Sequence, residues 1–148
     1  MKLKNNSDWI RIDFLQCAST SEYLRSTLKN IENCIEIILD FEIEEVGWGM
    51  VGDEYFTTLD IRNISAGLNN IYNGKSHHFN YSADFPYECS YELFYTINVS
   101  RVKNKVDVEL VIFDGLNDYI KINEKMELLQ FHEIVKEFEE VTKRCPVV

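Results

Sequence analysis

Residues 88–113 read ECSYELFYTINVSRVKNKVDVELVIF, and this stretch decides the fold. Apolar and polar side chains alternate over residues 88–100 and again over residues 105–113. A period of two residues is typical of a strand with one buried face. The intervening residues 101–104 are few enough to join the two strands as a hairpin. We therefore expect an antiparallel sheet at the centre of the fold.

The same alternation extends the sheet on both sides of this hairpin. It occurs toward the N-terminus at residues 9–14, 34–46 and 76–81. Toward the C-terminus, a turn signal precedes a further short strand at residues 119–122. Because neighbours in sequence pair most simply, the pattern predicts one antiparallel meander sheet of about five or six strands.

Two segments have the spacing of amphipathic helices. The first covers residues 58–73, with Thr58 as its N-cap and Gly74 as its C-terminal stop. The second covers residues 128–144, with basic residues in the last turn and Pro146 beyond it. The expected class is therefore α+β, with two main helices packed on the sheet.

Two other segments give weaker patterns. Residues 19–33 carry an apolar helical face but many Ser and Thr residues, so a short helix and an irregular segment both fit. Residues 47–52 contain three glycines, which predicts a turn or a bulge. The same glycines do not match the spacing of a dinucleotide-binding loop.

Length and charge define the class of protein. The chain has 148 residues and 45% hydrophobic residues, which suits one domain covering residues 1–148. Its formal net charge of -10 would repel phosphate backbones, so we expect no direct binding of nucleic acid. An acidic surface would instead steer a basic partner, although it also serves simple solubility.

The four cysteines are spaced singly, with no histidine at ligand spacing, so no zinc site is expected. They are Cys17, Cys34, Cys89 and Cys145. The N-terminal segment lacks the apolar run of a signal peptide, and no stretch is apolar enough to span a membrane. These features predict a cytoplasmic protein with reduced thiols, no metal, no cofactor and no membrane contact.

No residue set in the sequence predicts an enzyme. His77 and His78 are adjacent, and on a strand they would point to opposite faces, so only one could join a given site. His132 lies between apolar positions of the second helix, where a partly buried structural role is expected. We therefore assign no catalytic residues.

An acidic strand with nearby aromatic residues is the strongest candidate for a partner-binding surface. Carboxylates would speed the encounter with a basic partner, and aromatic side chains would anchor it. A solvated strand face is the alternative explanation. The candidate residues are Asp40, Glu42, Glu44, Glu45, Trp48, Asp53, Glu54 and Tyr55.

Three segments share an order of elements and apolar positions with a known family. They are EYFTTLDIRNISAGLNNIYNGKSHHFNY at residues 54–81, YELFYTINVSRVKNKVDVELVIFD at residues 91–114, and FHEIVKEFEEVTKRCPVV at residues 131–148. In this order the chain resembles the WapI-type immunity proteins, which protect bacteria against polymorphic toxins. The resemblance implies a small, cytoplasmic, noncatalytic protein that covers or locks a cognate toxin domain. The family has no catalytic residues to transfer.

The leading hypothesis is an antitoxin that binds its toxin, a nuclease being one candidate, through the acidic surface. We expect a monomer or a weak homodimer. An alternative is a small-ligand-binding protein or an enzyme with a pocket between sheet and helices. That pocket would use His77 or His78 together with Asp84, Tyr91 and Tyr95. A third possibility is a self-associating structural module.

Overall fold

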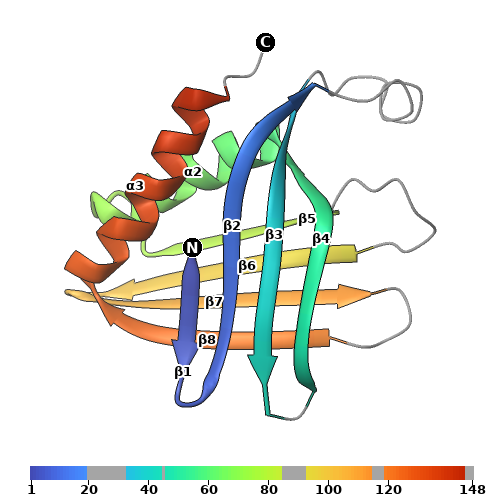
Figure 1. Ribbon diagram of the computed structural model, residues 1–148. Coiled ribbons are helices and arrows are strands. Elements are labelled where there is room, and N and C mark those ends of the chain that lie inside the picture. The colour runs from blue at the N-terminus through green and yellow to red at the C-terminus, as the bar shows by residue number, and fades with distance from the viewer. Residues whose placement is uncertain (20–32, 45, 85–92, 115–118, 146–148) are drawn as a thin grey trace.

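The computed structural model describes residues 1–19, 33–44, 46–84, 93–114 and 119–145 (Figure 1). Within these residues the chain folds into strands and helices in one repeated order, four strands followed by one helix. The first set is β1 (Lys2–Asn5), β2 (Asp8–Ser19), β3 (Asn33–Ile43), β4 (Gly47–Thr57) and α2 (Thr58–Tyr72). The second set is β5 (His78–Asp84), β6 (Leu93–Val102), β7 (Lys105–Asp114), β8 (Tyr119–Glu127) and α3 (Leu128–Arg144).

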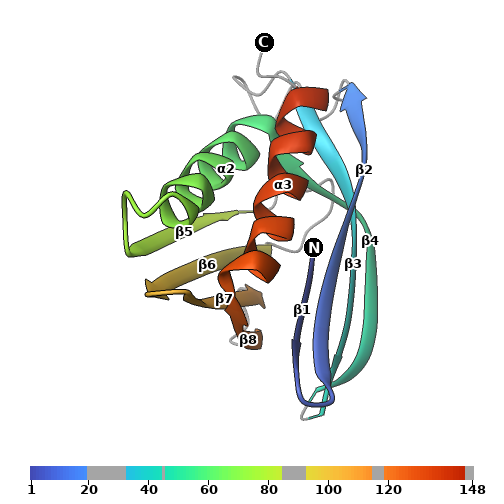
Figure 2. The same ribbon diagram turned by 90° about the vertical axis from the view of Figure 1, so that its left-hand side faces the viewer.

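The strands form two four-stranded antiparallel sheets, β1-β2-β3-β4 and β5-β6-β7-β8. Figure 1 shows the strands of the second sheet running across those of the first, and Figure 2 shows α3 lying between the two sheets. The α+β class and the two helices are confirmed. The prediction of a single meander of five or six strands is wrong, because each sheet is a separate meander and α2 divides them.

The two strands that the sequence did not predict are β1 and β4. In β1 only Leu3 is buried, so no alternation stands out over so short a strand. The glycines of residues 47–52 lie in β4, where Ile37 pairs with Glu54 but Leu39 pairs with Val51. The extra residue on β4 is a bulge, so part of that prediction holds although the segment as a whole is a strand. Residues 20–32, part of the ambiguous segment, lie outside the described residues.

Helix α2 is closed at both ends. Its N-cap is Thr57 and not Thr58, because the Thr57 hydroxyl accepts the backbone N–H of Asp60 at 3.0 Å. At the other end Gly74 has a φ of 74°. The N–H groups of Gly74 and Lys75 return to the carbonyls of Ile71 and Asn70, which is a Schellman motif. The predicted stop at Gly74 is confirmed.

Arg101 adds a second cap to α2 from the second sheet. Its guanidinium donates to the carbonyls of Ile71 at 2.9 Å and Tyr72 at 2.7 Å. A cation at a helix C-terminus also opposes the negative end of the helix dipole. The β6–β7 hairpin is therefore fastened to the end of α2.

One hydrophobic cluster contains residues of both sheets and both helices. At Gly67 the backbone of α2 lies so close to the ring of Phe79 on β5 that a Cβ would clash with it. Phe14 on β2 meets Phe138 on α3 edge to face, with ring centroids 5.2 Å apart. Each helix therefore packs directly against a sheet, α2 against β5 and α3 against β2.

Cys17 on β2 and Cys145 after α3 form a disulfide across a sequence separation of 128 residues. The prediction of reduced thiols is wrong for these two residues, because the sheet and the helix bring together cysteines that are distant in sequence. The other two cysteines have side chains outside the described residues. Neither α2 nor α3 is long and apolar enough to cross a membrane.

Candidate partner-binding surfaces

The outer face of the first sheet carries part of the predicted acidic surface, and Arg11 balances part of its negative charge. Arg11 on β2 forms ion pairs with Asp40 at 2.5 Å and with Asp13 at 3.2 Å. The indole N–H of Trp9 donates to Glu42 at 3.2 Å. The face therefore holds Asp40 and Glu42 as predicted, but β2 supplies cationic and aromatic partners for them.

The first strand contributes further cations to this face. Lys2 pairs with Arg11 across the β1–β2 ladder, and its ammonium lies 5.1 Å from the centroid of the Trp9 ring. Lys4 pairs with Trp9 in the same ladder. Because β1 was not predicted, this face is less negative than the sequence pattern indicates.

The other predicted residues divide into three groups. Glu44 is exposed beyond the end of β3, and Glu45 lies outside the described residues. The backbones of Trp48, Asp53, Glu54 and Tyr55 belong to β4, while their side chains are outside the description. In the β3–β4 ladder Trp48 pairs with Glu42, Tyr55 with Glu36, and Glu54 with the buried Ile37. The strand register therefore places the backbone of Trp48 directly opposite that of Glu42.

A cleft of about 570 Å³ lies between the ends of the two sheets. Ile43, Ile120 and Ile122 line it with buried apolar side chains. Two exposed apolar residues stand beside them: Val46, with 56% of its surface accessible, and Tyr119, with 62%. The cleft is thus open to solvent and partly apolar.

Two carboxylates complete this cleft. Asp8 at the start of β2 accepts the backbone N–H of Glu44 at 2.9 Å, and both side chains line the cleft. Neither carboxylate forms an ion pair within the described part of the chain. Glu44 was predicted from the sequence, whereas Asp8, Val46 and Tyr119 were not. Strand pairing within the first sheet brings Asp8 to Glu44, and the meeting of the two sheets adds Tyr119, so no local signal marks these residues as one site.

A second hollow of about 580 Å³ lies on the outer face of the second sheet, and most of the residues that line it are polar. The amide of Asn98 bonds Asn80 on one side and donates to Glu109 at 3.0 Å on the other. Asn123 donates to Asp107 at 2.5 Å. These side chains satisfy one another across the strands, so the face is ordered before any ligand binds.

Two residues of the alternative pocket, His78 and Tyr95, lie on opposite faces of the second sheet. His78 is exposed and lines the polar hollow, whereas Tyr95 is fully buried on the inner face of the same sheet. His77 is exposed, and the side chains of Asp84 and Tyr91 lie outside the description. The sheet therefore separates His78 from Tyr95.

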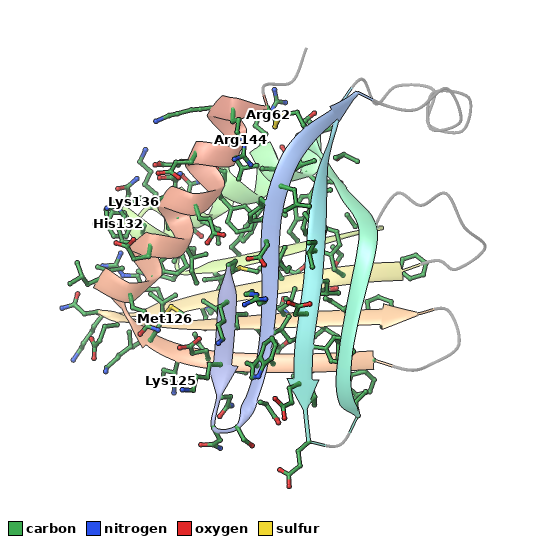
Figure 3. The ribbon with its side chains drawn as sticks, viewed as in Figure 1. Arg62, Lys125, Met126, His132, Lys136 and Arg144 are labelled. Carbon is green, nitrogen blue, oxygen red and sulfur yellow. A yellow bond between two sulfur atoms is a disulfide. The ribbon has the colours of Figure 1, made fainter. Side chains whose placement is uncertain are left out.

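His132 lies on α3 (Figure 3), and its ring contacts the other helix. Its ring stacks on Tyr72 of α2 with centroids 4.3 Å apart and an interplanar angle of 6°. Among the described residues no group of three or more His, Cys, Asp or Glu side chains could hold a metal ion. The ring contact agrees with the predicted packing role of His132.

Tyr81 has the one perturbed pKa that is resolved in the described part of the chain. Burial raises the pKa of Tyr81, and so does the hydrogen bond that its hydroxyl donates to Asp60 at 2.6 Å. This bond joins β5 to the first turn of α2. Its place at a helix–sheet contact indicates a structural role.

No protein-family model matches the chain, and no curated protein sequence matches it. A solved structure of the plant transcriptional regulator PBF-2 is similar in fold, with a TM-score of 0.52 and 10% sequence identity. The similarity covers 97% of this chain and 80% of that chain. At this identity the likeness concerns the fold alone.

Proposed function

We propose that this chain is a noncatalytic immunity protein that binds a cognate bacterial toxin domain and neutralises it. The observation that carries the proposal is the cleft between the sheet ends. It combines carboxylates that have no ion pair in the described chain with exposed apolar side chains. The resemblance of three segments to WapI-type immunity proteins supports the same function.

The chemistry of the cleft suits a basic protein partner. Unpaired carboxylates attract basic groups over a distance of about one Debye length, roughly 8–10 Å in physiological salt. Exposed aromatic and aliphatic residues then supply contact area that is removed from water on binding. The net charge of -10 adds a long-range attraction for a basic toxin domain.

The partner-binding surface would run from this cleft along the outer row of β3. Glu42 and Glu44 remain its strongest members, because both are exposed and neither carries an ion pair with a described residue. Asp40 contributes less, since Arg11 balances its charge. The register of Trp48 opposite Glu42 makes this tryptophan a candidate anchor.

Co-expression tests the function directly. The chain is produced together with the C-terminal domain encoded by each adjacent open reading frame, and growth and co-purification are scored. Rescue of growth with a stoichiometric complex is expected for one of these domains. Failure to find any domain that is toxic alone and harmless with this chain would count against immunity.

A second candidate is binding of a small polar ligand, and the hollow on the second sheet favours it. Its volume of about 580 Å³ falls in the range of ligand sites, roughly 300–1,000 Å³. Thermal shift with panels of sugars, amino acids and nucleosides tests this candidate. A ligand of this hollow should raise Tm for the natural chain but not for Asn98→Ala, which breaks the amide ladder.

A further inference from the structure

We infer that the cleft between the sheet ends is a socket for an arginine side chain presented by a basic partner protein. The inference rests on the proposed function for the identity of that partner, but not for the chemistry of the socket. Its grounds are the apolar floor, the two carboxylates and the exposed tyrosine at one wall.

The floor suits the aliphatic part of a long basic side chain. Ile43 and Ile120 line the cleft and are 7% and 9% exposed. Most of the accessible apolar surface beside them comes from Val46. Arginine and lysine cover apolar surface with their methylene stems while the charged group stays at a polar edge. A short polar or acidic side chain would leave this floor in contact with water.

The carboxylates supply the charge. Asp8 is held by the N–H of Glu44, which fixes the two residues relative to each other. An ionised carboxylate offers about four acceptor sites, so one bond to a backbone N–H leaves acceptors for a cation. Lys121 also lines the cleft, but its ammonium lies 3.2 Å from Glu109 on the outer face of the second sheet. The negative charge of the cleft is therefore not cancelled locally.

Tyr119 favours arginine over lysine. A guanidinium is planar and weakly hydrated, so it stacks on an aromatic ring and still donates in a fork to a carboxylate. The ammonium of lysine is a compact and strongly hydrated charge that makes fewer of these contacts at once. An exposed tyrosine that lines the same cleft as two acidic residues thus favours the guanidinium.

Peptide probes test the socket without a known partner. The ¹⁵N-labelled protein is titrated with hexa-arginine and with hexa-lysine at physiological salt, while amide signals are followed by NMR. Hexa-arginine should shift the signals of Glu44, Val46 and Tyr119 and bind at least about fivefold more tightly than hexa-lysine. Equal affinities, or shifts confined to other surfaces, would overturn the inference.

Variants separate the socket from general electrostatics. Asp8→Asn with Glu44→Gln keeps an oxygen acceptor at residue 8 for the N–H of Glu44, so the fold should persist. This variant should lose about tenfold or more in affinity for hexa-arginine, as expected for charged hydrogen bonds. The matched control, Glu133→Gln with Glu140→Gln, removes the same charge from exposed positions of α3 and should change affinity less than twofold. Equal losses in both variants would show that only net charge matters, against the socket.

Tyr119→Ala gives a second, independent check, because Tyr119 is exposed and its loss should leave the fold intact. It should abolish the preference for arginine while leaving binding of hexa-lysine nearly unchanged.

If a second copy of the chain fills the cleft instead, sedimentation will show a dimer that Tyr119→Ala disrupts, and the inference is wrong. If the variant with Asp8→Asn and Glu44→Gln still rescues growth and binds the toxin domain with undiminished affinity, the proposed function stands and the socket is wrong. If hexa-arginine binds specifically but no toxin partner exists, the socket stands and the proposed function is wrong.

Discussion

The two sheets share an order of elements and an apolar inner face, yet their outer faces are built differently. The first is held by charges, with Arg11 between Asp13 and Asp40. The second adds a network of amides, with Asn98 between Asn80 and Glu109, beside the ion pair of Glu109 with Lys121. The inner faces must be alike because they bury one hydrophobic cluster, whereas the outer faces meet only water or a partner. A partner therefore has access to the outer faces and to the cleft where the sheets end.

The two helices also differ in the contacts that attach them to the sheets. Helix α2 approaches β5 closely enough to require Gly67, and its last turn is capped by Arg101. Helix α3 has no side-chain hydrogen bond at its N-cap Glu127, and it is joined to the first sheet by aromatic rings and a disulfide. Substitutions at these contacts test whether the two helix attachments are equally important.

The largest effect is expected at Phe138, where α3 meets the first sheet. Phe138 is fully buried, so Phe138→Ala removes a ring and leaves a cavity, which should lower the free energy of unfolding by about 3–5 kcal/mol. Urea denaturation measures the change. Leu129→Ala on the same helix is the control, because its side chain is 79% exposed and the change should stay within about 0.5 kcal/mol. Similar values for both substitutions would mean that α3 is not anchored at Phe138.

The disulfide should give the next effect. Cys17→Ser with Cys145→Ser removes a link across 128 residues and should lower the free energy of unfolding by about 2–4 kcal/mol. Reductant should destabilise the natural chain by a comparable amount and leave the double variant unchanged. Mass spectrometry of an unreduced digest should contain the cross-linked peptide pair. Absence of that pair from folded protein would contradict the assignment.

Gly67→Ala tests the close approach of α2. In an open helix this change would stabilise by about 1 kcal/mol, but here the new Cβ meets the ring of Phe79. We expect a net loss of roughly 1–2 kcal/mol, measured by thermal and urea unfolding. The double variant Gly67→Ala with Phe79→Leu offers space for the methyl group. It should destabilise less than the sum of its two single substitutions.

The sequence predicted the elements whose pattern is local and strong. The hairpin of β6 and β7, the helices and the stop at Gly74 follow from periodicity and backbone preferences that act over a few residues. The pairing of Cys17 with Cys145 and the division into two sheets depend on contacts far apart in sequence. The candidate site divides in the same way: Glu44 was predicted from its strand, whereas Asp8 joins it through the pairing of β2 with β3 and Tyr119 through the meeting of the two sheets.

Charge reversal within one face separates folding from binding. Asp40 has a side chain that is 13% exposed and one buried oxygen with no hydrogen-bond partner among the described residues. Asp40→Lys would place two cations side by side at Arg11 and should cost about 1–2 kcal/mol of stability. Glu42→Lys, on an exposed position, should cost less than about 0.5 kcal/mol. Binding of a basic partner, measured by calorimetry, should weaken in both.

The smallest effect is expected at Tyr81, the polar contact between α2 and the second sheet. Burial and the bond to Asp60 raise the pKa of Tyr81 in the folded chain. The contribution of the protonated hydroxyl to the free energy of unfolding is therefore fully present below the unfolded pKa of about 10. It is lost as pH rises from there through the raised folded pKa. Tyr81→Phe should therefore be about 1 kcal/mol less stable than the natural chain at pH 7, and this difference should shrink above pH 10. Tyr119→Phe removes an exposed hydroxyl from the same sheet and should change stability by less than about 0.5 kcal/mol at either pH. If the Tyr81 difference stays constant with pH, the bond to Asp60 does not hold the helix to the sheet, and other contacts such as those of Gly67 and Arg101 attach α2.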